Sequence, residues 1–407
     1  MTRTRRTITT SCGSFLWGCR KDRRINNCRV LPTRRAGADG TRSVPATFLA
    51  TLIDAPILGR FCYNLGMNTL QENLLAASQP TTHGWHELAD RILQGHPLSS
   101  EEGLSILRSP DEQLLDLLAA TYRIRRQRWG NQVRLNFLIN AKSGACAEDC
   151  GYCSQSRVSK AEISRYALLL PDQILDGART AFQRKAKTYC IVTSGRSPGK
   201  LELDLVLELV PKIKQEYHLD ICVSAGLLGQ EQAERLKQCG VDRVNHNLNT
   251  SRRFYPQICT THTFQDRIDT LRAVRNAGME ICSGGILGMG EEDADVVELA
   301  LELGNLGVDA LPVNFFTPTE GTPVTAANPK KLSPRYCLKA LALFRLANPR
   351  CDLRMAAGRE LHLGWLQPLA LYAANSMFVG DYLTTKGQSP TEDYRMIEEL
   401  GFEVVEE

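Results

Sequence analysis

The chain has 407 residues, of which 43% are hydrophobic and 23% charged, and no apolar run approaches the roughly 18 residues of a membrane span. These values are typical of a globular protein with one large domain or two ordinary ones, and they argue against a membrane protein. The net charge of +4 is uneven, since residues 1–66 carry 12 Lys and Arg against 3 Asp and Glu, leaving −5 for the remainder. A mildly acidic body makes nucleic acid a poor default partner.

Residues 1–66 are rich in Arg, Ser and Thr and show no sustained periodicity, so we expect a disordered extension outside the fold. One interpretation is a transit peptide, which is typically Arg-rich and poor in acids. The other is a start assigned too far upstream, with Met67 as the true beginning, and the Cys and Trp usage favours it. We therefore expect a cytoplasmic protein, or an organellar one if residues 1–66 are a genuine transit peptide.

Residues 67–130 are expected to form N-terminal helices that pack on the main domain. Helical periodicity begins at Trp85, and Ser99 followed by acidic residues is typical of the start of a second helix. Ser109-Pro110 begins a third helix that runs towards Arg128.

The chain then alternates between short apolar strands and longer helical patterns. Strands are expected near 134–140, 188–193, 220–224, 241–246, 280–284, 309–314, 352–356 and 375–379. Helices are expected near 171–186, 201–217, 230–239, 263–277, 293–306, 333–347 and 361–373. Eight such units predict an α/β fold, a (β/α)8 TIM-type barrel over residues 131–387 with an N-terminal helical extension, and an open doubly wound sheet is the alternative. The tail, 388–407, carries no functional signal.

Three cysteines, Cys146, Cys150 and Cys153, follow the first strand, where a barrel places its active-site loops. Their C-x3-C-x2-C spacing is too cramped for disulfides. The alternatives are a zinc site or unrelated thiols, but zinc takes four ligands, and no fourth Cys or His is expected nearby, since the next one, Cys190, is on another strand. Three thiolates on a four-iron cluster leave one iron open to bind a substrate.

Three further cysteines, Cys190, Cys222 and Cys282, lie on the second, third and fifth strands. Strand side chains alternate, so each thiol can face the barrel axis. A single such cysteine would be read as a small buried hydrophobe, but three on neighbouring strands suggest a second, deeper metal site. Arg354, on the seventh strand, is a residue type that is normally exposed or paired with a carboxylate.

Polar residues and glycines end the later strands. Alternation places Asn245, Asn247 and Asn249 on one face, suited to a polar uncharged group such as a cyclic urea, and an Asn-rich turn is the alternative. His246 should face outwards with a structural role. Asn314 on the sixth strand must be satisfied by protein or ligand. Two glycines, Gly284 and Gly285, allow a flat ring to approach the backbone.

These motifs resemble the radical S-adenosylmethionine enzymes, and among them the biotin synthase family, from about Trp85 to about Gly387. The resemblance rests on residues 146–156, on 245–251, on 282–286, on Gly321-Thr322-Pro323, on 357–360 and on Ala374-Asn375-Ser376. It implies an enzyme that makes biotin from dethiobiotin by two C–H abstractions and two C–S bonds. Cleavage of S-adenosylmethionine would provide the 5′-deoxyadenosyl radical for each abstraction.

The resemblance also implies roles for individual residues. A [4Fe–4S] cluster would be held by Cys146, Cys150 and Cys153, and a sulfur-donating [2Fe–2S] cluster by Cys190, Cys222, Cys282 and Arg354. Asn245 and Asn314 would bind dethiobiotin, and Tyr152, Asn247, Asn249, Gly284 and Gly285 would lie towards S-adenosylmethionine. Family members often have Asp where Asn249 stands, which weakens that assignment.

The expected partners are a flavodoxin-like or ferredoxin-like electron donor and a second copy in a homodimer, without nucleic acid or membrane. Another radical S-adenosylmethionine enzyme on the same barrel is one alternative, and a non-catalytic iron–sulfur or zinc protein is the other. The remaining thiols, Cys239, Cys259, Cys337 and Cys351, match no family ligand and are interpreted as structural.

Overall fold

The computed structural model describes residues 83–405. The expectations for residues 1–66, for a start at Met67 and for residues up to 82 lie outside this part of the chain. Among the described residues, no helix combines the length and apolar character needed to cross a membrane.

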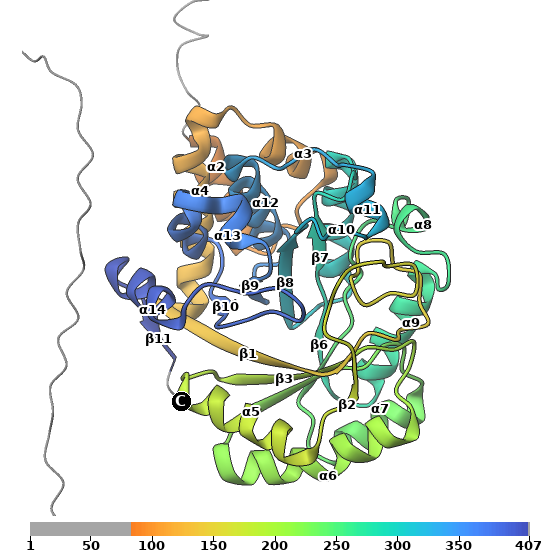
Figure 1. Ribbon diagram of the computed structural model, residues 1–407. Coiled ribbons are helices and arrows are strands. Elements are labelled where there is room, and N and C mark those ends of the chain that lie inside the picture. Colours follow the sequence, from red (N-terminus) through yellow and green to blue (C-terminus); the bar gives the residue numbers. More distant parts are fainter. Residues whose placement is uncertain (1–82, 406–407) are drawn as a thin grey trace, which may run out of the picture. The chain divides into compact units, whose positions relative to one another are not determined.

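Eight parallel strands close into a barrel, which confirms the predicted fold (Figure 1). The last strand pairs with the first, with Arg134 opposite Ser376. The barrel strands are β1 (Gln132–Ser143), β3 (Thr188–Thr193), β4 (Asp220–Ser224), β5 (Arg243–Asn245), β6 (Glu280–Cys282), β8 (Ala310–Phe315), β9 (Asp352–Met355) and β10 (Ser376–Phe378). A short strand, β7 (Gly285–Leu287), follows β6 and also pairs with β8. Because every barrel strand runs the same way, all their carboxyl ends meet at one rim.

Helices surround the barrel at the expected places, because each follows a strand and buries one apolar face (Figure 1). They are α5 (Pro171–Gln183), α6 (Lys200–Tyr217), α7 (Gln230–Gln238), α9 (Phe264–Asn276), α10 (Asp293–Asn305) and α12 (Pro334–Ala347). Two short helices, α8 (Tyr255–Ile258) and α11 (Pro323–Ala326), lie in the loops after β5 and β8.

The helix expected over 361–373 is only partly correct. The segment forms α13 (Arg359–Leu363) and then the 3₁₀ helix η2 (Gly364–Tyr372). Gly364 has φ +50°, outside the right-handed helical region, and Pro368 lacks the N–H that an α-helix needs. The two residues explain the change of helix type.

The N-terminal helices are α2 (His83–Leu93), α3 (Ser100–Arg108), η1 (Asp111–Gln113) and α4 (Leu114–Trp129). Ser99 caps α3 as predicted: its Oγ accepts from the Glu102 N–H at 3.2 Å, and Glu102 Oε2 accepts from the Ser99 N–H at 2.9 Å. Helix α3 packs against α10 and α12, and α4 packs against α12.

The C-terminal tail has a structural role that the sequence did not reveal. It forms α14 (Pro390–Glu399) and β11 (Glu403–Val404), and β11 pairs in parallel with the start of β1. Asp393 of α14 is fully buried, and its carboxylate accepts from Arg359 Nη2 at 2.8 Å and 3.0 Å. A further strand, β2 (Tyr166–Leu168), pairs antiparallel with β1.

Candidate active site

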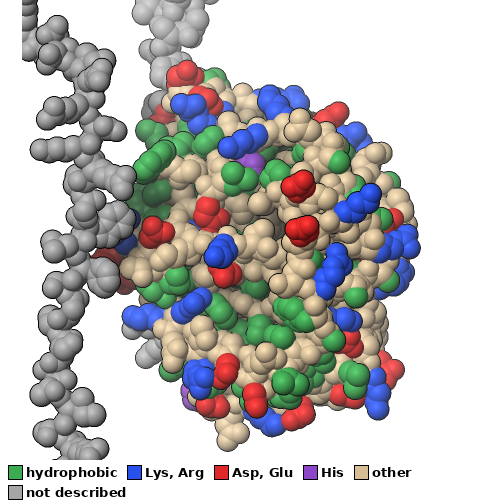
Figure 2. Space-filling model, viewed as in Figure 1, with side chains coloured by type: hydrophobic (Ala, Val, Ile, Leu, Met, Phe, Trp, Pro, Cys, Tyr) green, Lys and Arg blue, Asp and Glu red, His purple; other side chains and the backbone are tan. Residues whose placement is uncertain are grey.

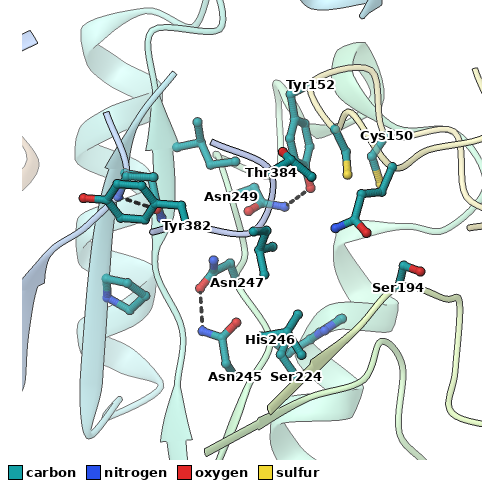
Figure 3. A pocket seen from close by; sticks show the side chains of 18 of the residues that line it. Cys150, Tyr152, Ser194, Ser224, Asn245, His246, Asn247, Asn249, Tyr382 and Thr384 are labelled. Atoms are coloured by element: carbon teal, nitrogen blue, oxygen red, sulfur yellow. Dashed lines mark hydrogen bonds between the residues drawn. The ribbon is translucent and has the colours of Figure 1, made fainter. Parts of the chain in front are cut away.

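The barrel encloses a cavity of about 400 Å³ that contains nearly all the predicted site residues. Its wall includes the deep thiols. The cysteine loop, the end of β5 and the segment after β10 also line it (Figure 3). On the face of the molecule seen in Figure 2, charged side chains of both signs are interspersed. The predicted residues that line the cavity are Cys146, Cys150, Tyr152, Cys153, Cys190, Cys222, Asn245, Asn247, Asn249, Cys282, Asn314 and Arg354.

The cysteine loop is fixed by backbone hydrogen bonds to two neighbouring loops. The Gly151 N–H donates to the Ile258 carbonyl at 2.8 Å, and the Val324 N–H donates to the Gly151 carbonyl at 3.0 Å. The Asp149 carboxylate accepts from the Thr260 N–H at 2.9 Å. Although partial burial opposes it, hydrogen bonding from the Thr260 hydroxyl and N–H lowers the pKa of Asp149 far below its usual value.

Cys146, Cys150 and Cys153 all turn towards the cavity from this loop, with Cys150 buried and the other two half-buried. Burial raises the pKa values of Cys146 and Cys153, so both thiols are neutral in the metal-free chain. Three soft sulfur donors on a short loop at the strand ends fit iron of a cluster, which would displace their protons on binding.

The sequence-based statement that no fourth Cys or His lies near the triad is wrong. Cys259 Sγ is 3.8 Å from Cys150 Sγ, and His262 Nδ1 is 3.3 Å from Cys259 Sγ. Both residues follow α8 in the chain, and folding brings that loop against the triad. Proximity of this kind follows from topology and leaves no mark on local spacing.

This cluster still does not favour zinc. Arg267 Nη2 lies 2.9 Å from His262 Nε2, and since guanidinium only donates, Nε2 must accept. A ring proton is therefore on Nδ1, which points to Glu148 Oε2 at 2.5 Å. Neither ring nitrogen of His262 offers a free lone pair to a metal in this arrangement.

The deep thiols form a separate buried cluster inside the barrel. Cys190, Cys222 and Cys282 pack with Ala310, and all three are at most 5% exposed. Cys190 and Cys222 face each other across β3 and β4, as the strand alternation predicted. Hydrogen bonding from Cys222 lowers the pKa of Cys282 to about 6, against the effect of burial. Three thiols at one level of a barrel suit a small metal cluster.

Arg354 lies beside these thiols and is 1% exposed. Its Nε donates to Ser376 Oγ at 3.3 Å, and its Nη2 lies 3.4 Å from Asp352 Oδ2. Burial lowers the pKa of Arg354, but attraction to Asp352, Cys282 and Cys190 outweighs it, so the pKa is raised and the guanidinium stays charged.

A second arginine, which the sequence reasoning missed, completes a buried ion chain. Arg243 Nη1 is 3.8 Å from Asp352 Oδ2, and Arg243 Nη2 binds Glu280 at 2.6 Å. One sequence signal could have indicated part of this ion chain. Asp352 and Arg354 are two residues apart on β9, and side chains two apart on a strand point to the same face, so Asp352 could have been placed beside Arg354.

The asparagine row is largely where the sequence predicted it (Figure 3). Asn245 Nδ2 donates to Asn247 Oδ1 at 3.0 Å and lies 3.2 Å from Cys282 Sγ. Asn249 Nδ2 donates to Tyr152 Oη at 2.5 Å, which joins the end of β5 to the cysteine loop.

The expectation that His246 faces outwards is wrong. Its side chain is buried and lines the cavity, and burial lowers its pKa well below the usual value, so the ring is neutral. Strand β5 ends at Asn245, so the alternation used for the prediction does not extend to His246. His246 Nε2 has no hydrogen-bond partner in the described part of the chain.

Asn314 is satisfied by the backbone, since its Nδ2 donates to the Gly285 carbonyl at 3.1 Å and its Oδ1 accepts from the Ala357 N–H at 3.2 Å. The prediction that Gly284 and Gly285 contact a ligand is not supported, because neither lines the cavity. A Cβ on Gly284 would lie 1.9 Å from the Pro312 carbonyl oxygen, and one on Gly285 would lie 2.4 Å from Leu299 Cδ2. Close packing between β7 and its neighbours explains both glycines.

Comparison with known proteins identifies two domains in the chain. Residues 141–343 match the Radical SAM superfamily, and residues 312–403 match the Biotin and Thiamin Synthesis associated domain. The second match ends at Glu403, the first residue of β11, and therefore covers most of the C-terminal tail.

Curated relatives match over most of their length. The chain is 56% identical to the biotin synthase of Rhodopirellula baltica over 319 residues, which is 78% of this chain and 88% of the relative. It is 52% identical to the biotin synthase of Geobacillus kaustophilus, covering 79% and 96% of the two chains. The biotin synthase of Bacillus subtilis is 51% identical, with 79% and 95% covered.

Solved structures show a similar fold at low identity. Methylornithine synthase superposes with a TM-score of 0.66 at 20% identity, covering 78% of this chain and 97% of that one. The hydrogenase maturase of Carboxydothermus hydrogenoformans gives 0.66 at 18% identity, covering 83% and 82%. Together with the curated relatives, the two domain matches show that this chain belongs to the biotin synthase family, whose members are radical S-adenosylmethionine enzymes that insert sulfur.

Proposed function

We propose that the barrel cavity holds S-adenosylmethionine and dethiobiotin together, between a [4Fe–4S] cluster at the cysteine loop and a [2Fe–2S] cluster at the deep thiols. The observation that carries this proposal is the presence of two sets of three cysteines along one cavity, with an amide row beside them. Sulfur insertion needs a radical source and a sulfur source on either side of one substrate. A single thiol set would serve only one of these needs.

Cys146, Cys150 and Cys153 would hold the four-iron cluster. When bound with S-adenosylmethionine, this cluster supplies the one-electron chemistry that removes hydrogen from unactivated carbon. Tyr152 and Asn249 form a hydrogen-bonded wall beside it. This wall would orient S-adenosylmethionine and keep water away from the reacting carbon.

Cys190, Cys222 and Cys282 would hold the two-iron cluster with Arg354 as the fourth ligand, and this cluster would donate sulfur. Arg354 is anchored by Ser376 and Asp352, so its guanidinium is pre-positioned. A guanidinium is a very rare metal ligand, and its fixed charge also offsets negative charge on thiolates nearby.

Asn245 and Asn247 would recognise the cyclic urea of dethiobiotin. Each amide has two N–H donors and two acceptor sites, and the bonds described above use only part of this capacity. Asn314 is held by two backbone bonds, and its second N–H is left to face the substrate.

The family resemblance supports the remaining assignments. We propose a flavodoxin-like or ferredoxin-like electron donor, a homodimer and a cytoplasmic location. We also propose that residues 67–130 form N-terminal helices that pack on the radical barrel of residues 131–387, and that residues 388–407 are a C-terminal tail.

The proposal is tested by anaerobic reconstitution with iron and sulfide, followed by mass spectrometry of biotin formed from dethiobiotin. The wild type is expected to show two spectroscopically distinct clusters and to form biotin. The Cys190→Ala variant should lose the [2Fe–2S] signal and biotin formation but keep the [4Fe–4S] signal. Cys337→Ala, which removes a buried thiol of α12, is the matched control and should keep both.

Two outcomes would contradict the proposal. Retention of the [2Fe–2S] signal in Cys190→Ala would remove the deep site from the mechanism. Cleavage of S-adenosylmethionine without any conversion of dethiobiotin would instead favour another radical enzyme on the same barrel.

A further inference from the structure

Cys259 lies outside both thiol sets, yet its sulfur is 3.8 Å from that of Cys150. Cys259 is 4% exposed and Cys150 is 8% exposed, but Cys150 lines the barrel cavity, through which a small disulfide can reach its sulfur. The Cys259 thiol also donates to Asp149 Oδ1 at 3.3 Å, a bond that a hydroxyl could make equally well. Cys259 therefore needs an explanation of its own.

Hydrogen bonds between the residues next to Cys150 and those next to Cys259 hold the two cysteines as neighbours. Gly151 follows Cys150 and Ile258 precedes Cys259, and these two residues share the 2.8 Å N–H to carbonyl bond. On the other side, Asp149 accepts from the Thr260 N–H at 2.9 Å. Hydrogen bonds therefore flank the pair at both ends and fix which thiols meet.

The separation is short enough for covalent bonding after a small movement. A disulfide has a sulfur–sulfur distance of about 2.05 Å, so the two atoms must approach by less than about 2 Å. A rotation about the Cα–Cβ bond of either cysteine moves its sulfur by this order, and neither flanking hydrogen bond involves a cysteine atom. A metal held by Cys150, Cys259 and His262 is the other arrangement that such proximity allows, but the proton on His262 Nδ1 disfavours it.

We propose that Cys150 and Cys259 form a disulfide in the cluster-free chain by exchange with a low-molecular-weight disulfide such as oxidised glutathione. Cys150, which lines the cavity, attacks glutathione disulfide and releases one glutathione thiol, forming a mixed disulfide. The second cysteine then displaces the other glutathione and forms the Cys150–Cys259 bond. Two electrons pass to glutathione disulfide, and the two cysteine protons leave with the two reduced glutathione molecules.

The bond would act as a redox lock on cluster loading. This consequence rests on the proposed role of Cys150 as a cluster ligand, because a disulfide sulfur no longer offers a thiolate to iron. The same bond would keep Cys150 from higher, irreversible oxidation states while no cluster covers it. A dithiol reductant would restore the free ligand.

The first experiment maps disulfides in the full cluster-free chain after equilibration with oxidised glutathione and alkylation of the remaining thiols. Trypsin places the triad in residues 143–157 and Cys259 in residues 254–267, so the proposed bond links two peptides. Further cleavage after Glu148 and after Tyr152 separates Cys150 from the other two thiols of the loop. We expect the Cys150–Cys259 link as the main oxidised product, in the wild type and in the matched control Cys239→Ser.

The proposal would be overturned if Cys259 were found alkylated, and therefore free, while two cysteines of the triad were linked to each other. This result does not depend on biotin formation, so it leaves the proposed function intact. Conversely, the predicted link in a protein that makes no biotin would support the disulfide while the enzymatic assignment failed.

The second experiment measures cluster uptake from a carrier protein that holds a [4Fe–4S] cluster, with no free sulfide present. After treatment with oxidised glutathione, the wild type and Cys239→Ser should take up the cluster only when a dithiol reductant is added. In Cys259→Ser, Cys150 can form only a mixed disulfide with glutathione, so an excess of reduced glutathione, a monothiol, should be enough for uptake. Equal dependence on the dithiol reductant in Cys259→Ser and wild type would overturn the lock.

Discussion

The buried carboxylate of Asp352 offers a sharp test of how the deep site is held together. Asp352 is 8% exposed, and its Oδ2 lies 3.4 Å from Arg354 Nη2 and 3.8 Å from Arg243 Nη1. We consider the substitution Asp352→Asn, which keeps the shape and removes the charge. Asn375 Nδ2, which donates to Asp352 Oδ1 at 3.1 Å, still finds an acceptor in the variant amide.

The cost follows from the two distances. With an effective dielectric constant of about 20, the attractions are about 5 kcal/mol for Arg354 and about 4 kcal/mol for Arg243. Desolvation of the carboxylate already offsets several kcal/mol of this in the wild type. Arg243 keeps Glu280 as a partner, whereas Asp352 is the carboxylate that pairs with Arg354 among the described residues. We therefore expect a net loss of about 3–5 kcal/mol, the usual cost of leaving a buried charge unpaired.

Equilibrium urea unfolding of the cluster-free chain in the presence of a thiol reductant measures this loss. The matched control is Asp204→Asn, which breaks a solvent-exposed pair with Arg235 at 3.3 Å and should cost less than about 1 kcal/mol. A loss in Asp352→Asn no larger than that of the control would refute the reasoning, since the ion chain would then contribute no more than a surface pair.

Three further substitutions or conditions test other parts of the structure. Gly284→Ala should lower the free energy of unfolding, measured with urea, by at least about 3 kcal/mol. The reason is that the added Cβ would lie 1.9 Å from the Pro312 carbonyl oxygen. Tyr152→Phe should weaken S-adenosylmethionine binding about fivefold in equilibrium dialysis, because the hydrogen bond from Asn249 contributes about 1 kcal/mol. The lowered pKa of Asp149 means that its stabilisation is present above about pH 4 and is lost as the pH falls, so acid unfolding should be steeper in wild type than in Asp149→Asn.

Each of these has its own contradicting result. Gly84→Ala, at a helical position with no atom within 4 Å of the added Cβ, is the control for Gly284, and equal effects would contradict the packing argument. Unchanged S-adenosylmethionine binding in Tyr152→Phe would show that the tyrosine hydroxyl does not contribute to the binding site. Parallel acid profiles for wild type and Asp149→Asn would show that the carboxylate does not hold the cysteine loop.

Much of the barrel could be predicted from the sequence because its signals are local. Apolar strands alternate with amphipathic helices, and each pattern lies within one element. The same locality allowed Cys190, Cys222 and Cys282 to be placed on the inner face, because strand alternation fixes the direction of a side chain. These are the features that the structure confirms most closely.

The features that were missed depend on contacts between distant parts of the chain. Cys259 meets Cys150 across a separation of 109 residues, and no local pattern encodes that contact. Asp393 similarly meets Arg359 only after the tail folds back onto the barrel. His246 was misplaced for a different reason, because the strand ends one residue before it and the alternation stops there.

The central claim is that the deep thiols hold the sulfur that enters biotin, and one isotope measurement tests it most directly. The cluster-free chain is reconstituted with heavy-isotope sulfide, freed of excess sulfide and allowed a single turnover with dethiobiotin. Mass spectrometry should show biotin that carries the heavy sulfur, and Cys282→Ala should form none. Biotin that contains sulfur of natural isotopic composition, or labelled biotin from Cys282→Ala, would contradict the account.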